Sequence, residues 1–158
     1  MIRIGLIGLA RENNGHPFSY ASIINGVDLK AFPKDNWRVI YDYLITKHSS
    51  DIGINGARVT HVWTQSKKIS NTLIETCYID NIVDEYNEMI DVVDAIILAR
   101  DDENNHLVMA KPFLENGLKV FIDKPLTLDI DELEYFTPFL LSGQLMSCSG
   151  MRYCSELD

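Results

Sequence analysis

Hydrophobic positions along the chain fall into two kinds of segment. The first kind is a short, mostly apolar run of strand length, which is typical of parallel strands buried on both faces. We predict such strands at residues 2–9, 57–64, 92–99, 118–122 and 145–149. The second kind has apolar residues at helical spacing. It predicts helices at residues 18–25, 35–48, 67–77, 82–90, 103–116 and 129–141. Strands that alternate with helices predict an α/β fold with a parallel sheet.

A few residues mark where these helices begin. Pro17 suits the first turn of the helix that follows it. Asp35 and Ser66 can each cap a helix through a side-chain oxygen, and Asp129 opens the last helix. We therefore expect helices to start close to these four positions.

The first strand runs into Gly8 and a polar loop before the first helix. Strand, glycine turn and helix are the opening of a dinucleotide-binding unit. The fold class we predict is therefore α/β, a Rossmann-type doubly wound, mainly parallel sheet with helices on both faces. Ala10 and Asn13 occupy the second and third glycine positions of the fingerprint. Either Gly15 supplies the needed turn in a loop of inserted shape, or the phosphates lie differently. The alternative is an ordinary strand–helix connection. The expected cofactor contacts here are Gly8, Leu9, Ala10, Asn13 and Gly15.

The end of the second strand should meet the adenosine ribose, where an NAD site usually has an acid. The chain has no acid there and reads Thr64, Gln65, Ser66, Lys67, Lys68. A ribose 2′-phosphate would not be repelled, and Ser66 and Lys67 could hold it. Alternatively, Ser66 only caps the next helix. We expect Thr64, Gln65 and Ser66 to bind NAD or NADP, with a weak preference for NADP.

Two further strands also end in polar residues, at the edge where open α/β sheets bind ligands. Pro125 fixes its own φ and keeps Lys124 out of the helical region, which gives Lys124 a defined direction; a plain turn is the alternative. His106 opens a helix and is expected to point toward the same crevice, although a capping role is the usual one. The expected cofactor contacts are Ala99, Arg100, His106, Asp123, Lys124 and Pro125.

The composition argues against several classes of function. The formal net charge is −9, whereas nucleic-acid binding requires a basic face and an anionic membrane attracts cations. The chain has no apolar run long enough to predict a transmembrane helix. Its three cysteines are widely spread and lack metal-ligand spacing, so we expect neither a metal site nor a disulfide framework. A reducing cytoplasm fits this cysteine usage.

These motifs together resemble the cofactor-binding domain of the Gfo/Idh/MocA oxidoreductases, the glucose–fructose oxidoreductase and inositol dehydrogenase superfamily. The features that carry the resemblance are Gly8, the strand at 92–99, His106 and the segment 114–126. The family hallmark is Glu-Lys-Pro, and Asp123 is a conservative departure from it. The resemblance implies a Rossmann fold in which Lys124 lies beside the nicotinamide and the substrate, while Pro125 shapes the turn.

The resemblance also implies a function. The chain is expected to be the nucleotide-binding domain of an NAD(P)-dependent oxidoreductase of carbohydrate metabolism, acting on a sugar, polyol or related hydroxy compound. Lys124 and Asp123 would be catalytic: Lys124 would hydrogen-bond the substrate hydroxyl and steady the alkoxide, and Asp123 would orient Lys124. A second domain of the family supplies most of the substrate pocket, the dimer contact and the proton-accepting histidine.

Residues 1–150 are therefore expected to form the dinucleotide-binding domain, and residues 151–158 to begin a C-terminal substrate and dimerisation domain. On this hypothesis the chain is a truncated, inactive part of a homo-oligomeric enzyme. One rival hypothesis is a non-catalytic module that senses nucleotides or docks a partner. The other is an inactive remnant. The imperfect glycine loop favours both rivals, whereas the Asp-Lys-Pro turn favours a catalytic origin.

Overall fold

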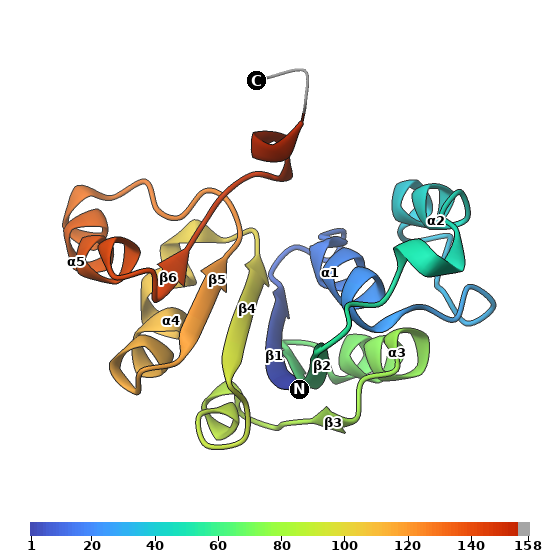
Figure 1. Ribbon diagram of the computed structural model, residues 1–158, viewed down its shortest axis with the longest axis horizontal. Coiled ribbons are helices and arrows are strands. Elements are labelled where there is room, and N and C mark those ends of the chain that lie inside the picture. The colour runs from blue at the N-terminus through green and yellow to red at the C-terminus, as the bar shows by residue number, and fades with distance from the viewer. Residues whose placement is uncertain (155–158) are drawn as a thin grey trace.

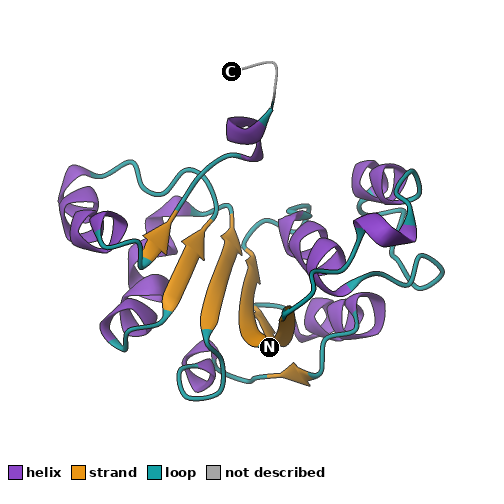
Figure 2. Cartoon of the chain, viewed as in Figure 1, coloured by secondary structure: helices purple, strands orange, loops and turns teal. Residues whose placement is uncertain are grey.

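The computed structural model describes residues 1–154 and contains a six-stranded sheet (Figures 1 and 2). The strand order is β3-β2-β1-β4-β5-β6, and every neighbouring pair is parallel. This order confirms the predicted doubly wound α/β sheet. The strands are β1 (Ile2–Leu9), β2 (Ala57–Thr64), β3 (Asn81–Ile82), β4 (Ala95–Arg100), β5 (Lys119–Ile122) and β6 (Leu145–Met146).

Helices cover both faces of the sheet. In Figure 1, α1 and α3 lie beside β1 and β2, and α4 and α5 lie beside β4, β5 and β6 on the other face. The helix α2 sits outside α1. The helices are α1 (His16–Asn25), α2 (Arg38–Leu44), α3 (Lys67–Cys77), α4 (His106–Glu115) and α5 (Ile130–Leu141). Short 3₁₀ turns occupy Ser49–Asp51, Tyr86–Met89, Glu103–Asn105 and Gly150–Tyr153.

The central strand β1 is buried on both sides because its side chains alternate between two cores. Ile4 and Leu6 belong to the core under α1 and α3. Ile7 points the opposite way and belongs to the core under α4 and α5. Successive strand residues face opposite sides of a sheet, so one apolar run supplies both cores. This explains the continuous apolar pattern from which the strand was predicted.

Three of the predicted elements differ most from the structure, and each is much shorter there. The helix expected at 35–48 begins only at Arg38, because a turn closes first: the carbonyl of Pro33 accepts the N–H groups of Asn36 and Trp37. Asp35 is therefore not its cap. The helix expected at 82–90 is only the single 3₁₀ turn Tyr86–Met89. The last strand pairs with β5 only through Leu145 and Met146.

Two predicted helix starts are at the expected residues, with different capping. Asp129 precedes α5, and its carboxylate accepts the N–H groups of Asp131 and Glu132, as an N-cap does. Ser66 precedes α3, but its side chain forms no capping hydrogen bond. The Thr64 hydroxyl instead donates to the Ser66 carbonyl at 2.7 Å. The capping interpretation of Ser66 is therefore wrong.

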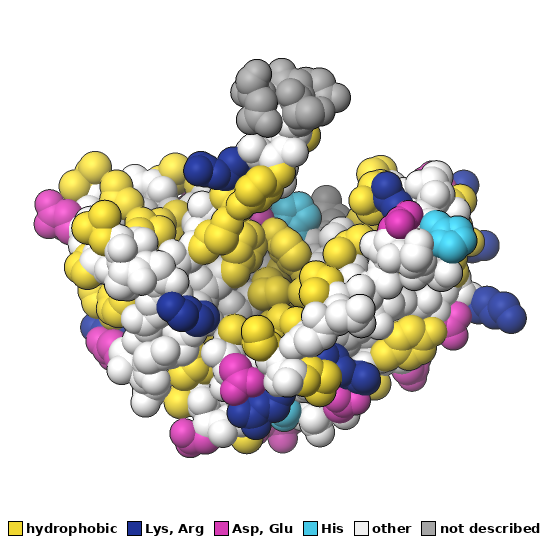
Figure 3. Space-filling view, viewed as in Figure 1, with side chains coloured by type: hydrophobic (Ala, Val, Ile, Leu, Met, Phe, Trp, Pro, Cys, Tyr) yellow, Lys and Arg dark blue, Asp and Glu magenta, His cyan; other side chains and the backbone are white. Residues whose placement is uncertain are grey.

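The face of β4, β5 and β6 that points toward the α1 side is only partly covered. Ile97, Phe121 and Met146 are neighbours across these strands, and they line a shallow cavity of about 200 Å³. The ring of Tyr20 on α1 contacts Phe121 edge to face, with centroids 5.6 Å apart. Figure 3 shows hydrophobic side chains across the hollow middle of this side of the molecule. An apolar sheet face is therefore accessible.

Candidate functional site

A cavity of about 470 Å³ lies at the carboxyl ends of β1 and β4. The strand order reverses between these two strands, and open α/β sheets bind ligands at such a point. The lining comes from the loop after β1, from the start of α1, and from the segments after β4 and β5. It includes Asn13, Gly15, His16, Asp101, Lys124 and Pro125.

The loop after β1 is a tight turn that brings the backbone against α1. A Cβ atom on Gly8 would lie 2.5 Å from Cγ of Pro17, so only glycine allows this approach. Leu9 and Ala10 have φ values of 82° and 93°, in the left-handed region that side chains rarely adopt. The chain thus forms a strand-to-helix cradle with the N-terminus of α1 behind it. Such a cradle fits the pyrophosphate of a dinucleotide.

Two backbone N–H groups of this loop are paired with neighbouring side chains. Gln65 accepts from the N–H of Ala10 at 3.2 Å and donates to the Ala10 carbonyl at 2.5 Å. Asp101 accepts from the N–H of Arg11 at 3.1 Å. Loop N–H groups at this point are the ones that bind phosphate oxygens in dinucleotide sites. Gln65 and Asp101 therefore compete with a phosphate.

Asn14 ties the parts of the crevice together, and sequence reasoning missed it. The side chain is buried, and its amide donates to the carbonyls of Leu9 at 3.0 Å and Ala99 at 3.2 Å. Its oxygen accepts the N–H of His16 at 3.0 Å. One asparagine thus joins the ends of β1 and β4 to the start of α1.

A second cavity of about 570 Å³ lies on the other side of the loop, at the end of β2. Gln65, Ser66 and Lys68 line it, together with Trp37 and the carboxylate of Glu12. The expected partner Lys67 points elsewhere, because its ammonium pairs with Asp84 at 2.7 Å. Thr64 is buried and is not among the lining residues. Lys68 rather than Lys67 therefore accompanies Ser66 here.

The turn after β5 places Lys124 and Pro125 on the opposite wall of the first cavity. Lys124 is exposed and also lines a third cavity of about 380 Å³. Its ammonium has no ion-pair partner within residues 1–154. Asp123 is only 2% exposed and accepts the backbone N–H of Lys124 at 2.9 Å. The Lys124–Pro125 bond is cis.

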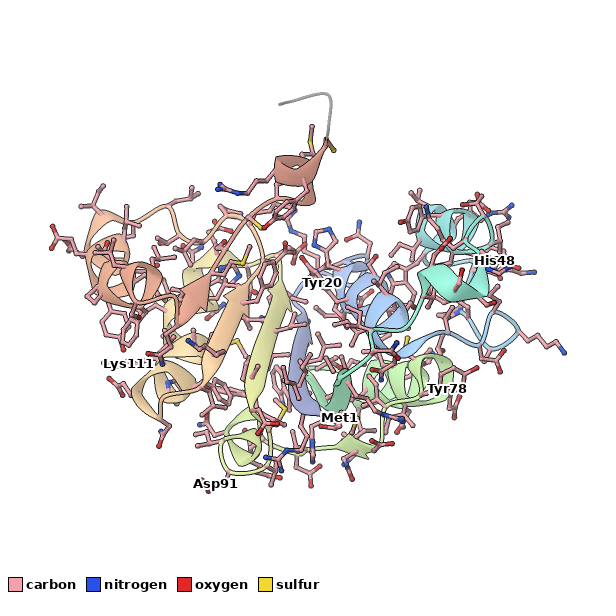
Figure 4. The ribbon with its side chains drawn as sticks, in the orientation of Figure 1. Met1, Tyr20, His48, Tyr78, Asp91 and Lys111 are labelled. Atoms are coloured by element: carbon pink, nitrogen blue, oxygen red, sulfur yellow. The ribbon has the colours of Figure 1, made fainter. Side chains whose placement is uncertain are left out.

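Asp123 also contacts two side chains from α1. Its carboxylate pairs with Nδ1 of His16 and lies 3.5 Å from the Tyr20 hydroxyl. Figure 4 labels Tyr20 on the side of α1 that faces the strands. Burial raises the pKa of Tyr20, and the nearby Asp123 carboxylate raises it further. The Tyr20 hydroxyl therefore stays protonated and serves as a hydrogen-bond donor.

Sequence reasoning did not find His16 as a site residue, and in the structure it lines both the first and the third cavity. The available signal was its position directly before Pro17, which fixes it as the first residue of α1. Its partner Asp123 is 107 residues away in the chain, so no local pattern connects the two. His16 and Asn14 are the residues that sequence reasoning missed.

The remaining predicted residues have mainly structural contacts. Ala99 is buried. Arg100 is buried too, forms an ion pair with Asp102 at 2.6 Å and donates to Gln65 at 2.9 Å. His106 is fully buried, and its two ring nitrogens contact the carbonyls of Leu126 and Arg100. The expectation that His106 points into the crevice is therefore wrong, because its ring spans two segments of backbone.

The ion pair after β4 favours the ionised form of Asp102. Partial burial alone would raise the pKa of Asp102. Hydrogen bonds from Arg100 and Asn105 outweigh burial, and the pKa of Asp102 is lowered. Asp102 therefore stays ionised beside Arg100, and this pair helps to hold Gln65 in place through the Arg100–Gln65 contact.

Sheet order, the cradle after β1 and the two flanking cavities define the class of protein, a dinucleotide-binding Rossmann domain. A family model described as "Oxidoreductase family, NAD-binding Rossmann fold" matches residues 43–137, which is more than half of the chain. The chain belongs to this family, the Gfo/Idh/MocA oxidoreductases.

Solved structures of longer proteins share the fold. One is scyllo-inositol dehydrogenase from Lactobacillus casei, with 20% identity, a TM-score of 0.64, and coverage of 96% of this chain and 37% of that chain. A second is myo-inositol 2-dehydrogenase from Lactobacillus plantarum, with 19% identity, a TM-score of 0.66, and coverage of 98% and 38%. A third is UDP-N-acetylglucosamine 3-dehydrogenase from Acidithiobacillus ferrooxidans, with 16% identity, a TM-score of 0.57, and coverage of 91% and 35%.

The chain thus spans less than two fifths of the length of these three proteins, and at these identities the likeness shows the fold alone. One further structure of the Lactobacillus casei enzyme contains NAD(H) and scyllo-inositol. No match is found among curated protein sequences.

Two further features of residues 1–154 concern a membrane span and a metal site. No helix within residues 1–154 is both long and apolar enough to cross a bilayer. The same residues include no cluster of three or more side chains that could hold a metal ion.

Proposed function

We propose that this chain is the nucleotide-binding domain of an NAD(P)-dependent oxidoreductase that acts on a sugar, polyol or related hydroxy compound. One observation carries the proposal: Lys124, with its ammonium unpaired within residues 1–154, lines the crevice at the switch point of the sheet opposite the cradle after β1. Family membership supports the nucleotide. The structures of similar fold, which are those of inositol and sugar-nucleotide dehydrogenases, support the substrate class.

The three cavities suggest how the cofactor lies. The adenosine would occupy the cavity at the end of β2, between Trp37 and Ile69. The pyrophosphate would lie against the loop from Leu9 to Gly15, and the nicotinamide would lie toward Ala99 and Lys124. Ser66 and Lys68 face the ribose position, and β2 ends without an acid there. Lys68 would attract a 2′-phosphate, so we retain a weak preference for NADP over NAD, although Glu12 of the loop lines the same cavity.

Lys124 would stabilise the substrate oxygen. When bound, the nicotinamide supplies the hydride acceptor. An ammonium donates hydrogen bonds to a hydroxyl and stabilises the alkoxide charge that develops as the hydride leaves. Asp123 would orient Lys124 through the backbone, since it accepts the Lys124 backbone N–H rather than an ammonium proton. Lys124 would therefore be catalytic and Asp123 a positioning residue.

We further propose that residues 1–150 are this domain and that residues from 151 onward begin a second domain; of these, 155–158 lie outside the described part of the chain. The accessible apolar face around Phe121 and Met146 supports a covering domain or a second copy, because large accessible apolar patches mark interfaces. A homo-oligomer is the assembly we expect. The free cysteines Cys77, Cys148 and Cys154 support a reducing, cytoplasmic location.

A second candidate function is a non-catalytic module that senses nucleotides or docks a partner. One specific observation favours it: the N–H groups of Ala10 and Arg11 are already paired with Gln65 and Asp101. A phosphate must replace these bonds, which weakens nucleotide binding. On this reading Lys124 has no chemical role.

Titration of the chain with NADH and NADPH, followed by cofactor fluorescence, tests the proposal. We expect saturable binding with an apparent Kd in the millimolar range or below, because the Gln65 and Asp101 contacts reduce the affinity. Lys124→Ala should leave the unfolding transition in place, and Lys119→Ala is the matched control, because Lys119 is an exposed lysine at the start of β5, away from the turn that holds Lys124. A folded chain that binds neither nucleotide would contradict the proposal.

A further inference from the structure

Trp37 carries a buried hydrogen-bond donor that no described residue satisfies. The residue is 5% exposed, and its indole Nε1–H group has no hydrogen-bond acceptor within residues 1–154. Buried donors without an acceptor are rare in native proteins, because leaving one unpaired is unfavourable. The other tryptophan differs, since Nε1 of Trp63 donates to the Asp84 carbonyl at 3.1 Å. Trp37 is therefore the tryptophan whose donor is available to a ligand.

The indole of Trp37 is held at the wall of the second cavity. Trp37 comes directly before α2, in the segment between α1 and β2 (Figure 1), and it lines this cavity beside the loop after β1. Its ring packs on Phe18, with the centroids 4.3 Å apart. Its Cδ1 atom, which is bonded to Nε1, would lie 2.8 Å from a Cβ atom on Gly15. The ring is thus fixed, with the edge that carries the N–H close to the loop after β1.

The lining of the second cavity indicates which kind of acceptor suits this donor. Pro33 and Ile69 give apolar walls beside Trp37, and such walls favour a flat ring whose few polar atoms set its orientation. Lys68 attracts an anion and Glu12 repels one, so the charges give the donor no net preference for a phosphate oxygen. Adenine is planar and neutral, and it has ring nitrogens that accept hydrogen bonds. An adenine ring nitrogen is therefore the acceptor that fits this cavity.

We propose that Trp37 anchors the adenine ring of the nucleotide by donating its indole N–H to a ring nitrogen of the base. This role rests on the function proposed above, which places adenosine in the second cavity. Trp37 lies before residues 43–137, the part that the family model matches, so this anchor is a feature of the chain's own segment between α1 and β2. Recognition of the base would support binding where Gln65 and Asp101 already occupy the loop N–H groups.

The two indole N–H signals of the isotope-labelled chain test the anchor directly. ¹H–¹⁵N spectra would be recorded while the whole chain is titrated with 5′-AMP, with Trp63→Phe used to assign the two signals. We expect the Trp37 signal to move downfield along the binding curve, because its proton gains an acceptor. The Trp63 signal should stay in place, because its proton is already bonded to the Asp84 carbonyl. Saturation by 5′-AMP without a downfield movement of the Trp37 signal would overturn the proposal.

Ribose 5-phosphate separates the base from the phosphate as the group that meets the donor. It carries the sugar and the phosphate without adenine, so it should leave the Trp37 signal in place. A downfield movement as large as that produced by 5′-AMP would assign the N–H of Trp37 to a phosphate oxygen and would contradict the proposal.

A change in affinity provides a second readout. Trp37→Phe removes the N–H group and keeps an aromatic ring against Phe18. It should weaken 5′-AMP binding by about three- to tenfold, the usual effect of losing one hydrogen bond. Trp63→Phe is the matched control and should leave the affinity unchanged. Equal affinity of folded Trp37→Phe and the unmodified chain would overturn the proposal, and the spectrum of the unmodified chain is decisive even if Trp37→Phe fails to fold.

Titration with NADH and NADPH separates the anchor from the function on which it rests. If 5′-AMP moves the Trp37 signal and neither dinucleotide binds, the oxidoreductase function is contradicted and the anchor is supported. If a dinucleotide binds and the Trp37 signal does not move downfield, the anchor alone is contradicted. A folded chain that binds neither 5′-AMP nor a dinucleotide would contradict both.

Discussion

The two halves of the crevice differ in how ready they are for a ligand. On the β1 and β2 side, the loop N–H groups of Ala10 and Arg11 are occupied by Gln65 and Asp101. On the β4 and β5 side, Lys124 is unpaired within residues 1–154 and Asp123 is held by His16. The β4 and β5 side is therefore arranged for chemistry before a ligand binds. On the β1 and β2 side, the N–H groups that would bind phosphates are already hydrogen-bonded to side chains of the protein.

This difference indicates that the affinity for a nucleotide and the arrangement of the catalytic lysine can change independently in one Rossmann domain. The loop keeps the tight turn with only one glycine of the fingerprint, at Gly8, and Ala10 adopts a positive φ in place of the second. Side chains from neighbouring strand ends then hold that strained backbone. The Asp123–Lys124 turn depends on none of these contacts. We therefore expect weak nucleotide binding at the loop after β1, although the Asp123–Lys124 turn keeps the arrangement that the chemistry requires.

The largest expected effect is on the rate of hydride transfer, which depends on the β4 and β5 side of the crevice. Lys124→Ala should lower the rate of hydride transfer by about 10²–10³-fold, the usual loss when one donor to a developing oxyanion is removed. The unfolding midpoint should not move, because the Lys124 side chain is exposed. Steady-state kinetics of a complete enzyme that contains this domain measures the rate, and thermal unfolding of the chain measures the midpoint, with Lys119→Ala as control in both. Loss of folding in Lys124→Ala would assign the lysine a structural role.

The next largest effect is on the stability of the loop after β1, where the backbone packs closely against α1. Gly8→Ala should lower the free energy of unfolding by about 1–3 kcal/mol, as overpacking does, because the new Cβ would lie 2.5 Å from Pro17. Denaturant titration measures the change. Gly150→Ala is the control, since a Cβ there has no atom within 4 Å. Equal stability of the two variants would show that α1 can shift away from β1.

A smaller effect is expected on nucleotide affinity when the negative charge beside the loop after β1 is removed. Asp101→Asn keeps an oxygen that can accept the Arg11 N–H and removes a negative charge beside the loop. It should tighten NADH binding by about three- to fivefold, corresponding to roughly 0.5–1 kcal/mol for a partly exposed charge. The gain should fade at high salt. Fluorescence titration checks it. Asp91→Asn, at the opposite end of the molecule (Figure 4), should change nothing. Unchanged affinity in Asp101→Asn would contradict the expectation that the charge of Asp101 weakens nucleotide binding.

The smallest expected effect lies outside both halves of the crevice. The Arg3 side chain donates to Asp94, and this hydrogen bond lowers the pKa of Asp94 from 3.8 to about 2. A lowered pKa stabilises the fold above about pH 4, and this contribution disappears as the pH falls toward 2. Unfolding of Asp94→Asn should therefore differ from that of the unmodified chain at neutral pH and converge with it near pH 2. A constant difference across this range would contradict the assignment.

Most of the fold could be predicted from the sequence because hydrophobic periodicity is a local signal. The predicted bounds are those of the structure for the strands at 2–9 and 57–64 and for the helix at 67–77. In each of them the spacing of apolar residues follows directly from which side chains are buried. The helix at 35–48 was overestimated because a turn at Pro33 and Asn36 competes for the same backbone groups. Local periodicity does not reveal that competition.

The site was less predictable because its contacts are long-range. Lys124 could be singled out from its strand end and proline. His16 could not, because its partner Asp123 is distant in the chain and approaches only when β5 is inserted beside β4. His106 was misread because a histidine at a helix start gives no sign of whether its ring faces solvent or bridges two carbonyls.

The central claim is that a nucleotide binds across the crevice with its nicotinamide beside Lys124. The most direct measurement is a set of NOEs between the nicotinamide protons of bound NADPH and the side chains of the isotope-labelled chain. We predict contacts from the nicotinamide C4 protons to Lys124 and from the adenine protons to Ile69 or Trp37. Saturating nucleotide with nicotinamide contacts only elsewhere on the surface would contradict the account.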